Sequence, residues 1–135
     1  MREFHLQIVT PDGLIFDGGC ESVAVKTTTG DVQIMYGHAD FFAPLSVGIA
    51  RIKTAEGGVR SASLAGGFIS VNKDGVKILA TTFEFASDID VSRALLAKEK
   101  AEAMISEAKS NTELSLARAK LLRALTRLDA AKEKH

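Results

Sequence analysis

The chain of 135 residues is long enough for one ordinary domain, or for a compact domain that carries an appendage. Its 17 basic and 17 acidic residues give a formal net charge of zero, so the charge balance does not indicate a nucleic acid or an anionic surface as partner. The single cysteine, Cys20, excludes an internal disulfide framework and is interpreted as a small buried apolar residue in a reducing compartment.

The two parts of the chain differ in composition. Every glycine, proline and aromatic residue lies before residue 88, and the remainder is built mostly from Ala, Leu, Lys, Glu and Arg. Glycine and proline favour turns and aromatic residues favour strands, whereas unbranched side chains favour helices. The sequence therefore predicts an α+β protein, with a β domain over 1–86 and a helical domain over 87–135.

Strands are predicted from the first residues onward. Phe4, Leu6 and Ile8 alternate with polar neighbours, which is typical of a strand with one buried face. The turn residues Pro11-Asp12-Gly13 follow, and a return strand over 14–16 is expected to break at Gly18-Gly19. Further short strands are predicted at 22–26, 32–35, 47–53, 59–65, 68–71 and 76–81. Hairpin turns are expected at 57–58 and 72–75, and this succession predicts a sandwich or a barrel.

Two helices are predicted after residue 87. Asp88 and Asp90 are N-cap candidates for the first helix, and Ser110 and Glu113 have the spacing of a capping box at the start of the second. The first apolar stripe consists of Val91, Ala94, Leu95, Ala101, Ile105 and Ala108. The second consists of Leu114, Ala117, Leu121, Ala124, Leu125, Leu128 and Ala131. The short link predicts an antiparallel helical hairpin with an alanine-rich seam.

Such a hairpin is expected to be weakly held. Alanine removes little apolar area from water, at about 0.8 kcal/mol per buried methylene. Leu96, Leu116 and Leu122 lie off the two stripes, so apolar surface should remain for the β domain or a partner protein. A weakly held element can move.

Catalytic and metal-binding patterns are not found. No glycine-rich phosphate loop ends in a lysine, and His5, His38 and His135 have no paired ligand at metal spacing. His5 and His38 are interpreted as surface or locally bonded residues, because a catalytic histidine needs a nucleophile and an orienting group. We therefore expect no enzyme active site, no metal and no required cofactor in this chain.

Four segments in order resemble a known family, the epsilon subunits of bacterial F-type ATP synthases, whose mitochondrial counterpart is called delta. These segments are FHLQIVTPDGLIFDG at 4–18, GDVQIMYGHADFFAPLSVG at 30–48, LAGGF at 64–68 and IDVSRA at 89–94. The resemblance covers nearly the full length. One loop departs from the family pattern, because Tyr36 and Asp40 replace its two prolines on either side of Gly37-His38.

The resemblance implies a fold and a set of partners. It implies a ten-stranded β-sandwich joined to the helical hairpin, in a non-catalytic central-stalk subunit that couples rotation of the c-ring to ATP synthesis. The implied partners are the gamma subunit, the c-ring, and the alpha and beta subunits of the catalytic head. The loop with Met35, Tyr36, Gly37 and His38 is expected to lie near the c-ring.

The resemblance also implies that the hairpin moves and inhibits ATP hydrolysis when extended into the catalytic head. The second helix carries Arg118, Arg123 and Arg127, which are candidates for pairing with acidic groups of the catalytic head. The alternative interpretation is a solvated basic face.

Some bacterial members of the family bind ATP on the folded hairpin, so ATP is expected as a regulatory ligand. The candidate residues, taken from the family motif and the arginines of the second helix, are Ile89, Asp90, Arg93, Ala94, Arg123 and Arg127, with Glu84 as an addition. Arginine suits phosphate oxygens because of its forked donors. The alternative is that Asp90 is only an N-cap and Arg93 only a surface residue.

Two other classes of function are kept open. One is a freestanding β-sandwich module that binds another protein, and the other is an enzyme with a site built around His38 and Asp40.

The chain lacks a signal-peptide pattern and a run of about 18 apolar residues. Together with this pattern, the resemblance implies a peripheral, indirect association with the cytoplasmic side of a bacterial membrane, through partner subunits.

Overall fold

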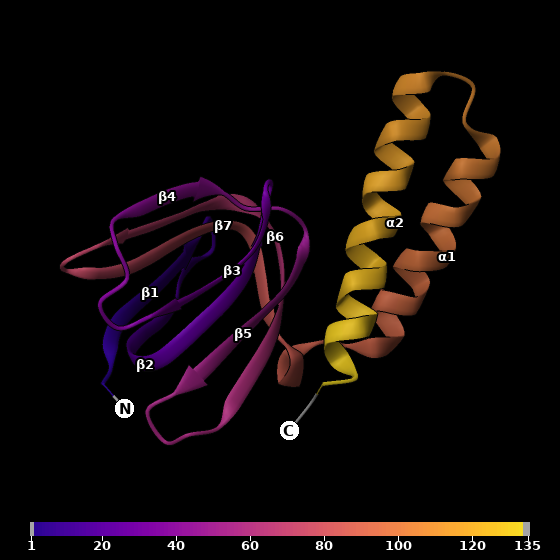
Figure 1. The fold of residues 1–135 in the computed structure, drawn as a ribbon. Helices are drawn as coiled ribbons and strands as arrows, with labels where there is room; N and C mark the ends of the chain where they lie inside the picture. The colour runs from indigo at the N-terminus through magenta and orange to yellow at the C-terminus, as the bar shows by residue number, and fades with distance from the viewer. Residues whose placement is uncertain (1, 134–135) are drawn as a thin grey trace.

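The computed structural model describes residues 2–133 as a β-sandwich with a helical hairpin beside it (Figure 1). Met1, Lys134 and His135 lie outside the described residues, so His135 is not located. The strands of the described part are β1 (Phe4–Thr10), β2 (Gly13–Thr27), β3 (Gly30–Met35), β4 (Phe41–Pro44), β5 (Gly48–Thr54), β6 (Val59–Asn72) and β7 (Gly75–Phe85). A short 3-10 helix, η1 (Ala86–Asp88), leads into α1 (Val91–Glu107) and α2 (Asn111–Ala131).

The strands form one sheet that folds back on itself. Their order is β1-β7-β6-β5-β2-β3, β4 pairs with β6, and β1 also pairs with β2. The β1–β7 pair is parallel and the other pairs are antiparallel. The core lies between the two layers, where Ile8, Ile69 and Ile78 are fully buried cross-strand neighbours.

The sandwich is confirmed, but the number of strands differs from ten. Seven strands occur in the described residues because the longest ones run through both layers. β2 continues through Gly18-Gly19, where the sequence predicted a break, and β6 joins the two predicted strands at 59–65 and 68–71. Gly66 and Gly67, with φ of 68° and 104°, bend β6 without ending it. A Cβ at Gly67 would lie 1.8 Å from the Leu79 carbonyl oxygen, so this crossing requires glycine.

The predicted helix caps Asp90 and Ser110 are confirmed, whereas Asp88, the other N-cap candidate, is the last residue of η1 and does not cap α1. The Asp90 side chain accepts a hydrogen bond from the Arg93 N–H at 3.1 Å, and Ser110 Oγ accepts one from the Glu113 N–H at 3.1 Å. Glu113 Oε2 in turn accepts from the Lys109 N–H at 2.7 Å. These bonds satisfy helix-end donors that would otherwise lack a partner, and they set where each helix begins.

The hairpin seam is made of alanine. Ala94, Ala101, Ala117 and Ala124 are buried between the helices, as the sequence predicted. The prediction was wrong for Val91, Leu95 and Leu125, which are 41%, 45% and 38% exposed. Close approach at the alanine positions leaves these larger side chains at the edges of the seam. Leu96, Leu116 and Leu122 are exposed, as expected.

The hairpin rests on the sandwich through a small contact. Ile89, Ala130 and Ala131 form a buried cluster of their own, against which Ile49 of β5 packs. This cluster is separate from the sandwich core. The hairpin is therefore attached at its base and does not share the hydrophobic core of the sandwich.

Candidate functional site

A cavity of about 620 Å³ lies between the sandwich and the hairpin. Its walls come from the β1–β2 turn, β6 and β7 on one side, and from α1 and α2 on the other. This volume is within the range of small-molecule sites, about 300–1,000 Å³. The cavity exists only while the hairpin is folded against the sandwich, because each body supplies half of its lining.

The helical wall of the cavity is basic. α1 contributes Arg93 and Lys100, which are seven residues apart, and α2 contributes Lys120, Arg123 and Arg127 at helical spacing. Such spacing places side chains on one face of a helix. Five cationic side chains therefore line one cavity, which favours an anionic ligand with several charges.

The sandwich wall carries the carboxylates. Glu84 of β7 and Asp12 of the β1–β2 turn line the cavity. Glu84 Oε1 accepts a hydrogen bond from Arg127 Nε at 2.9 Å, and the two side chains are 34% and 27% exposed. This ion pair connects β7 to α2 and holds one of the cationic groups at the cavity wall.

The structure separates the residues of the predicted ATP set into two groups. Glu84, Arg93, Arg123 and Arg127 line the cavity. Ile89 is buried in the cluster at the base of the hairpin, Ala94 is fully buried in the helical seam, and Asp90 caps α1. Among the described residues, these three hold the hairpin in shape and do not line the cavity.

The cavity is also lined by Lys100 and Lys120, which the sequence analysis did not predict as ligand-binding residues. Lys100 lies one heptad after Arg93, and Lys120 lies three residues before Arg123 and seven before Arg127. Extending the arginine pattern at helical spacing would have found both. Arg118, the remaining predicted arginine of α2, is exposed and does not line the cavity.

The loop at 35–38 is an exposed turn at the end of β3. The His38 N–H donates to the Met35 carbonyl at 3.1 Å, and Gly37 has a φ of 81°. The His38 Nδ1 is 2.7 Å from the Ala39 carbonyl, and its ring contacts Phe41 edge-on. Tyr36 lies under the Arg2 guanidinium, and both it and Met35 are exposed. These are local contacts, and nothing in them orients His38 on a nucleophile.

A second surface feature is a row of apolar side chains across one face of the sandwich. Leu14, Val9, Leu79, Phe68 and Pro44 are successive register partners on β2, β1, β7, β6 and β4. Phe42 stacks on Phe68 at 5.5 Å between ring centroids. We call these six residues the apolar band. Leu14, Phe42, Phe68 and Leu79 are 46–65% exposed, which is unusual for so many neighbouring large apolar residues and typical of an interaction surface.

Cys20 is fully buried, as predicted. Burial, with a smaller contribution from the Glu3 carboxylate, raises the pKa of its thiol to about 12. The thiol therefore stays protonated at neutral pH and is a poor nucleophile.

Two absences hold for residues 2–133. No three His, Cys, Asp or Glu side chains lie close enough together to hold a metal ion. Neither α1 nor α2 has the length and hydropathy that a membrane span requires.

Comparison with protein families covers almost the whole chain. The β-sandwich domain of the ATP synthase delta/epsilon chain matches residues 3–86, and the long α-helix domain of the same chain matches residues 87–132. The chain belongs to the ATP synthase delta/epsilon family. Members of this family named epsilon chains are non-catalytic subunits of the rotary ATP synthase.

Curated relatives agree over their full length. The chain is 42% identical to the ATP synthase epsilon chain of Halalkalibacterium halodurans, over 97% of this chain and 98% of that one. It is 40% identical to that of Bacillus velezensis, again over 97% and 98%. A match of this extent favours the epsilon-chain function over a freestanding binding module.

Solved structures show the same fold. A chain of the Euglena gracilis mitochondrial ATP synthase superposes with a TM-score of 0.81 at 22% identity, over 97% of this chain and 82% of that one. A chain of the Tetrahymena thermophila mitochondrial ATP synthase central stalk and c-ring gives a TM-score of 0.63 at 16% identity, over 96% and 97%. The sandwich-plus-hairpin fold thus also occurs in chains of these two mitochondrial ATP synthase structures.

Proposed function

We propose that this chain is a rotor subunit of the central stalk that couples c-ring rotation to ATP synthesis in the catalytic head. The observation that carries this proposal is the division of the molecule into a well-packed sandwich with an uncovered apolar band and a hairpin attached at its base. A rigid body with a docking face can transmit torque, and a weakly attached hairpin can regulate it. No step of this function requires chemistry on the chain itself.

The apolar band supports docking on the gamma subunit. Phe42 and Phe68 form a stacked, exposed aromatic pair at the β4 end of the apolar band, and aromatic side chains are the usual anchors of protein interfaces. We propose that the exposed loop at 35–38 faces the c-ring, with the alpha and beta subunits reached by the hairpin. Through these partners the chain would be held at the cytoplasmic face of a bacterial membrane.

Replacing the aromatic pair tests the docking face. Phe42→Ser with Phe68→Ser should lower the affinity for gamma by tenfold or more, because two anchors are lost while the core is untouched. Affinity is measured by titrating labelled chain with purified gamma. Leu116→Ser, at an equally exposed apolar residue of α2, is the matched control and should bind as the parent does. Unchanged binding of the double variant would place the interface elsewhere.

For the hairpin we propose inhibition of ATP hydrolysis when it is extended. Release from the sandwich would free Arg127 from Glu84 and present it, with Arg118 and Arg123, to acidic groups of the catalytic head. Deleting residues 88–135 should therefore raise hydrolysis by the reconstituted enzyme. An unchanged rate would remove the inhibitory role and leave the rotor role standing.

We also propose that ATP binds in the cavity and favours the folded hairpin. The donor set fits a triphosphate, with five cationic side chains on the helical wall and the carboxylates of Glu84 and Asp12 opposite, able to accept from an amino group. Because both bodies line the cavity, a ligand there stabilises the folded arrangement.

Calorimetric titration with MgATP tests the nucleotide site. Arg123→Ala should weaken binding about tenfold, because it removes a charged phosphate donor from the cavity wall. Arg118→Ala removes the same charge from the same helix outside the cavity and should leave affinity unchanged. No heat from the parent chain at millimolar MgATP would exclude the site, and equal losses in both variants would indicate a general charge effect.

A further inference from the structure

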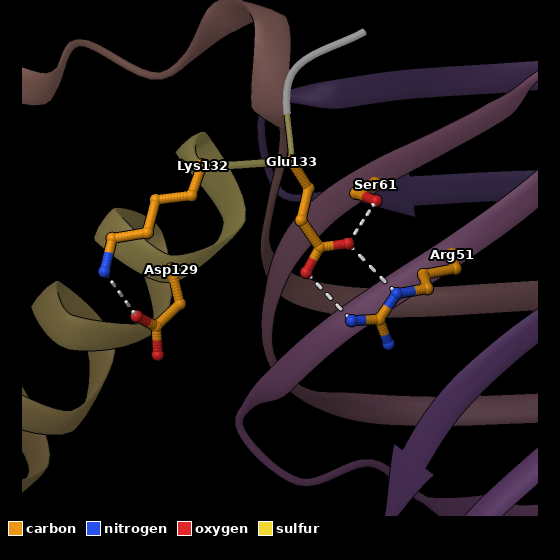
Figure 2. Close-up of polar contacts among 5 residues, drawn as sticks. All are labelled: Arg51, Ser61, Asp129, Lys132 and Glu133. Carbon is orange, nitrogen blue, oxygen red and sulfur yellow. Dashed lines mark hydrogen bonds and ion pairs between the residues drawn. The ribbon is translucent and has the colours of Figure 1, made fainter.

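The end of the described chain reaches back to the sandwich. Glu133, just after α2, is contacted by Arg51 of β5 and Ser61 of β6 (Figure 2). Arg51 donates from Nε to Oε1 at 3.0 Å and from Nη2 to Oε2 at 2.8 Å, and Ser61 Oγ donates to Oε1 at 2.9 Å. Arg51 and Ser61 are register partners, so adjacent strands direct three donors at one carboxylate.

The contact has the geometry of a specific site. Two parallel bonds from one guanidinium to one carboxylate form the strongest common type of ion pair in proteins. Ser61 is 3% exposed and the Glu133 side chain 29%, and Phe85 and Ala86 help to line the small recess around them. None of Arg51, Ser61 and Glu133 lines the 620 Å³ cavity, so this contact is distinct from the candidate nucleotide site.

Local helix energetics do not favour a glutamate at this position. The carboxyl end of a helix carries a partial negative charge, which disfavours a neighbouring anion, and the last turn of α2 has no basic residue. Next to Glu133, Lys132 and Asp129 pair at 3.7 Å, are 79% and 64% exposed, and lie on α2 away from Arg51 and Ser61 in Figure 2. The favourable interactions of Glu133 with Arg51 and Ser61 therefore come from the docked arrangement and not from the helix.

We propose that Arg51, Ser61 and Glu133 form a latch that sets the fraction of chains with the hairpin docked. We call these three residues the Glu133 latch. The inference rests on the proposed mobility of the hairpin, and it assigns the holding contact to a site separate from the nucleotide cavity. Weakening the latch raises the undocked population and lowers the apparent affinity of any ligand that needs the docked form.

Native-state hydrogen exchange of the full chain tests the latch, because it detects undocking even when the open form is rare. Glu133→Gln should raise the exchange rates of the α2 amides about fivefold and leave those of β6 and β7 unchanged. Arg51→Gln, which does not alter the helix, should give a similar rise. The double variant Arg51→Glu with Glu133→Arg restores opposite charges and should recover most of the lost protection.

The effect of losing the latch can be separated from the effect of changing a charge at the end of α2. The direction of the change in exchange rate and a control variant at Lys132 distinguish the two. Removing the charge of Glu133 relieves its repulsion with the helix end, which by itself would slow exchange, so faster exchange reports lost contacts with the sandwich. Lys132→Gln removes an adjacent charge that pairs with Asp129 at the same helix end, so it measures the effect of a helix-end charge alone and should raise the rates of α2 less than Glu133→Gln does. Parent-like α2 rates in both Glu133→Gln and Arg51→Gln would overturn the latch.

Adding MgATP to the same experiment separates the two proposals. If Glu133→Gln accelerates α2 exchange while MgATP protects neither chain, the latch stands and the nucleotide site fails. If MgATP slows α2 exchange in the parent and neither latch variant accelerates it, the nucleotide site stands and the latch fails.

Discussion

The sandwich and the hairpin are stabilised by different kinds of buried side chain. The sandwich core draws on all seven described strands and consists mainly of Leu, Ile, Val and Phe side chains, whereas the helical seam consists mainly of alanine. At about 0.8 kcal/mol per buried methylene, a buried isoleucine contributes several times as much as a buried alanine. The difference explains how one short chain can combine a rigid body with an element that is easily released.

A few polar contacts hold the hairpin on the sandwich, in addition to its small apolar contact. The two ion pairs are opposite in polarity. In the Glu84–Arg127 pair the sandwich supplies the carboxylate, whereas in the Glu133 latch it supplies the guanidinium of Arg51. Partly exposed ion pairs contribute about 0–1 kcal/mol each. Contacts of this size bias an equilibrium between docked and undocked hairpins without fixing it.

The largest expected effect is in the sandwich core. Ile78→Ala should lower the free energy of unfolding by about 3 kcal/mol, because Ile78 is fully buried between Ile8 and Ile69. Urea unfolding followed by fluorescence of an introduced tryptophan or by circular dichroism measures the loss. Leu79→Ala, the next residue and 46% exposed, is the control and should cost much less. Equal losses of unfolding free energy in the two variants would mean that Ile78 is no more buried in the core than Leu79.

A smaller and local effect is expected in the helical seam. Ala117 is fully buried, so Ala117→Leu should push the helices apart at a cost of about 1–3 kcal/mol to the hairpin. Helical circular dichroism should fall while the unfolding transition of the sandwich keeps its midpoint. Ala119→Leu places the same side chain at an exposed position of α2 and should be neutral. A shift in the sandwich transition with Ala117→Leu would show that the two bodies unfold together.

The smallest expected effect is the one that the ionisation of Cys20 produces between pH 9.0 and roughly pH 9.5. Its pKa is raised to about 12 in the folded chain, so above the ordinary value of 9.0 the unfolded thiol loses its proton before the folded one does. Stability should therefore fall as the pH rises from 9.0 toward 12, by about 0.8 kcal/mol at roughly pH 9.5. Unfolding curves of the parent and of Cys20→Ala across this range measure the difference in slope. Identical slopes would mean that the thiol ionises equally in both states.

Local signals in the sequence located most of the elements and the starts of both helices. The alternation of Phe4, Leu6 and Ile8 located β1, and the capping residues Asp90 and Ser110 located the starts of α1 and α2. β4 was missed, because four residues around an exposed Phe42 carry too short a pattern. The family resemblance identified part of the cavity lining, including Arg123 and Arg127, whose spacing places them on one helical face.

Sequence patterns could not show which side chains meet across the two bodies. Composition and periodicity determined that this chain would have a turn-rich β body, a helical hairpin and an alanine seam, because turn, strand and helix preferences act over a few neighbouring residues. Tertiary structure alone decided that β2 and β6 cross both layers, that Lys100 and Lys120 join the arginines at one cavity, and that Glu133 meets Arg51. Those contacts join residues far apart in the chain, and their geometry is set by strand register and by the docking of one body on the other.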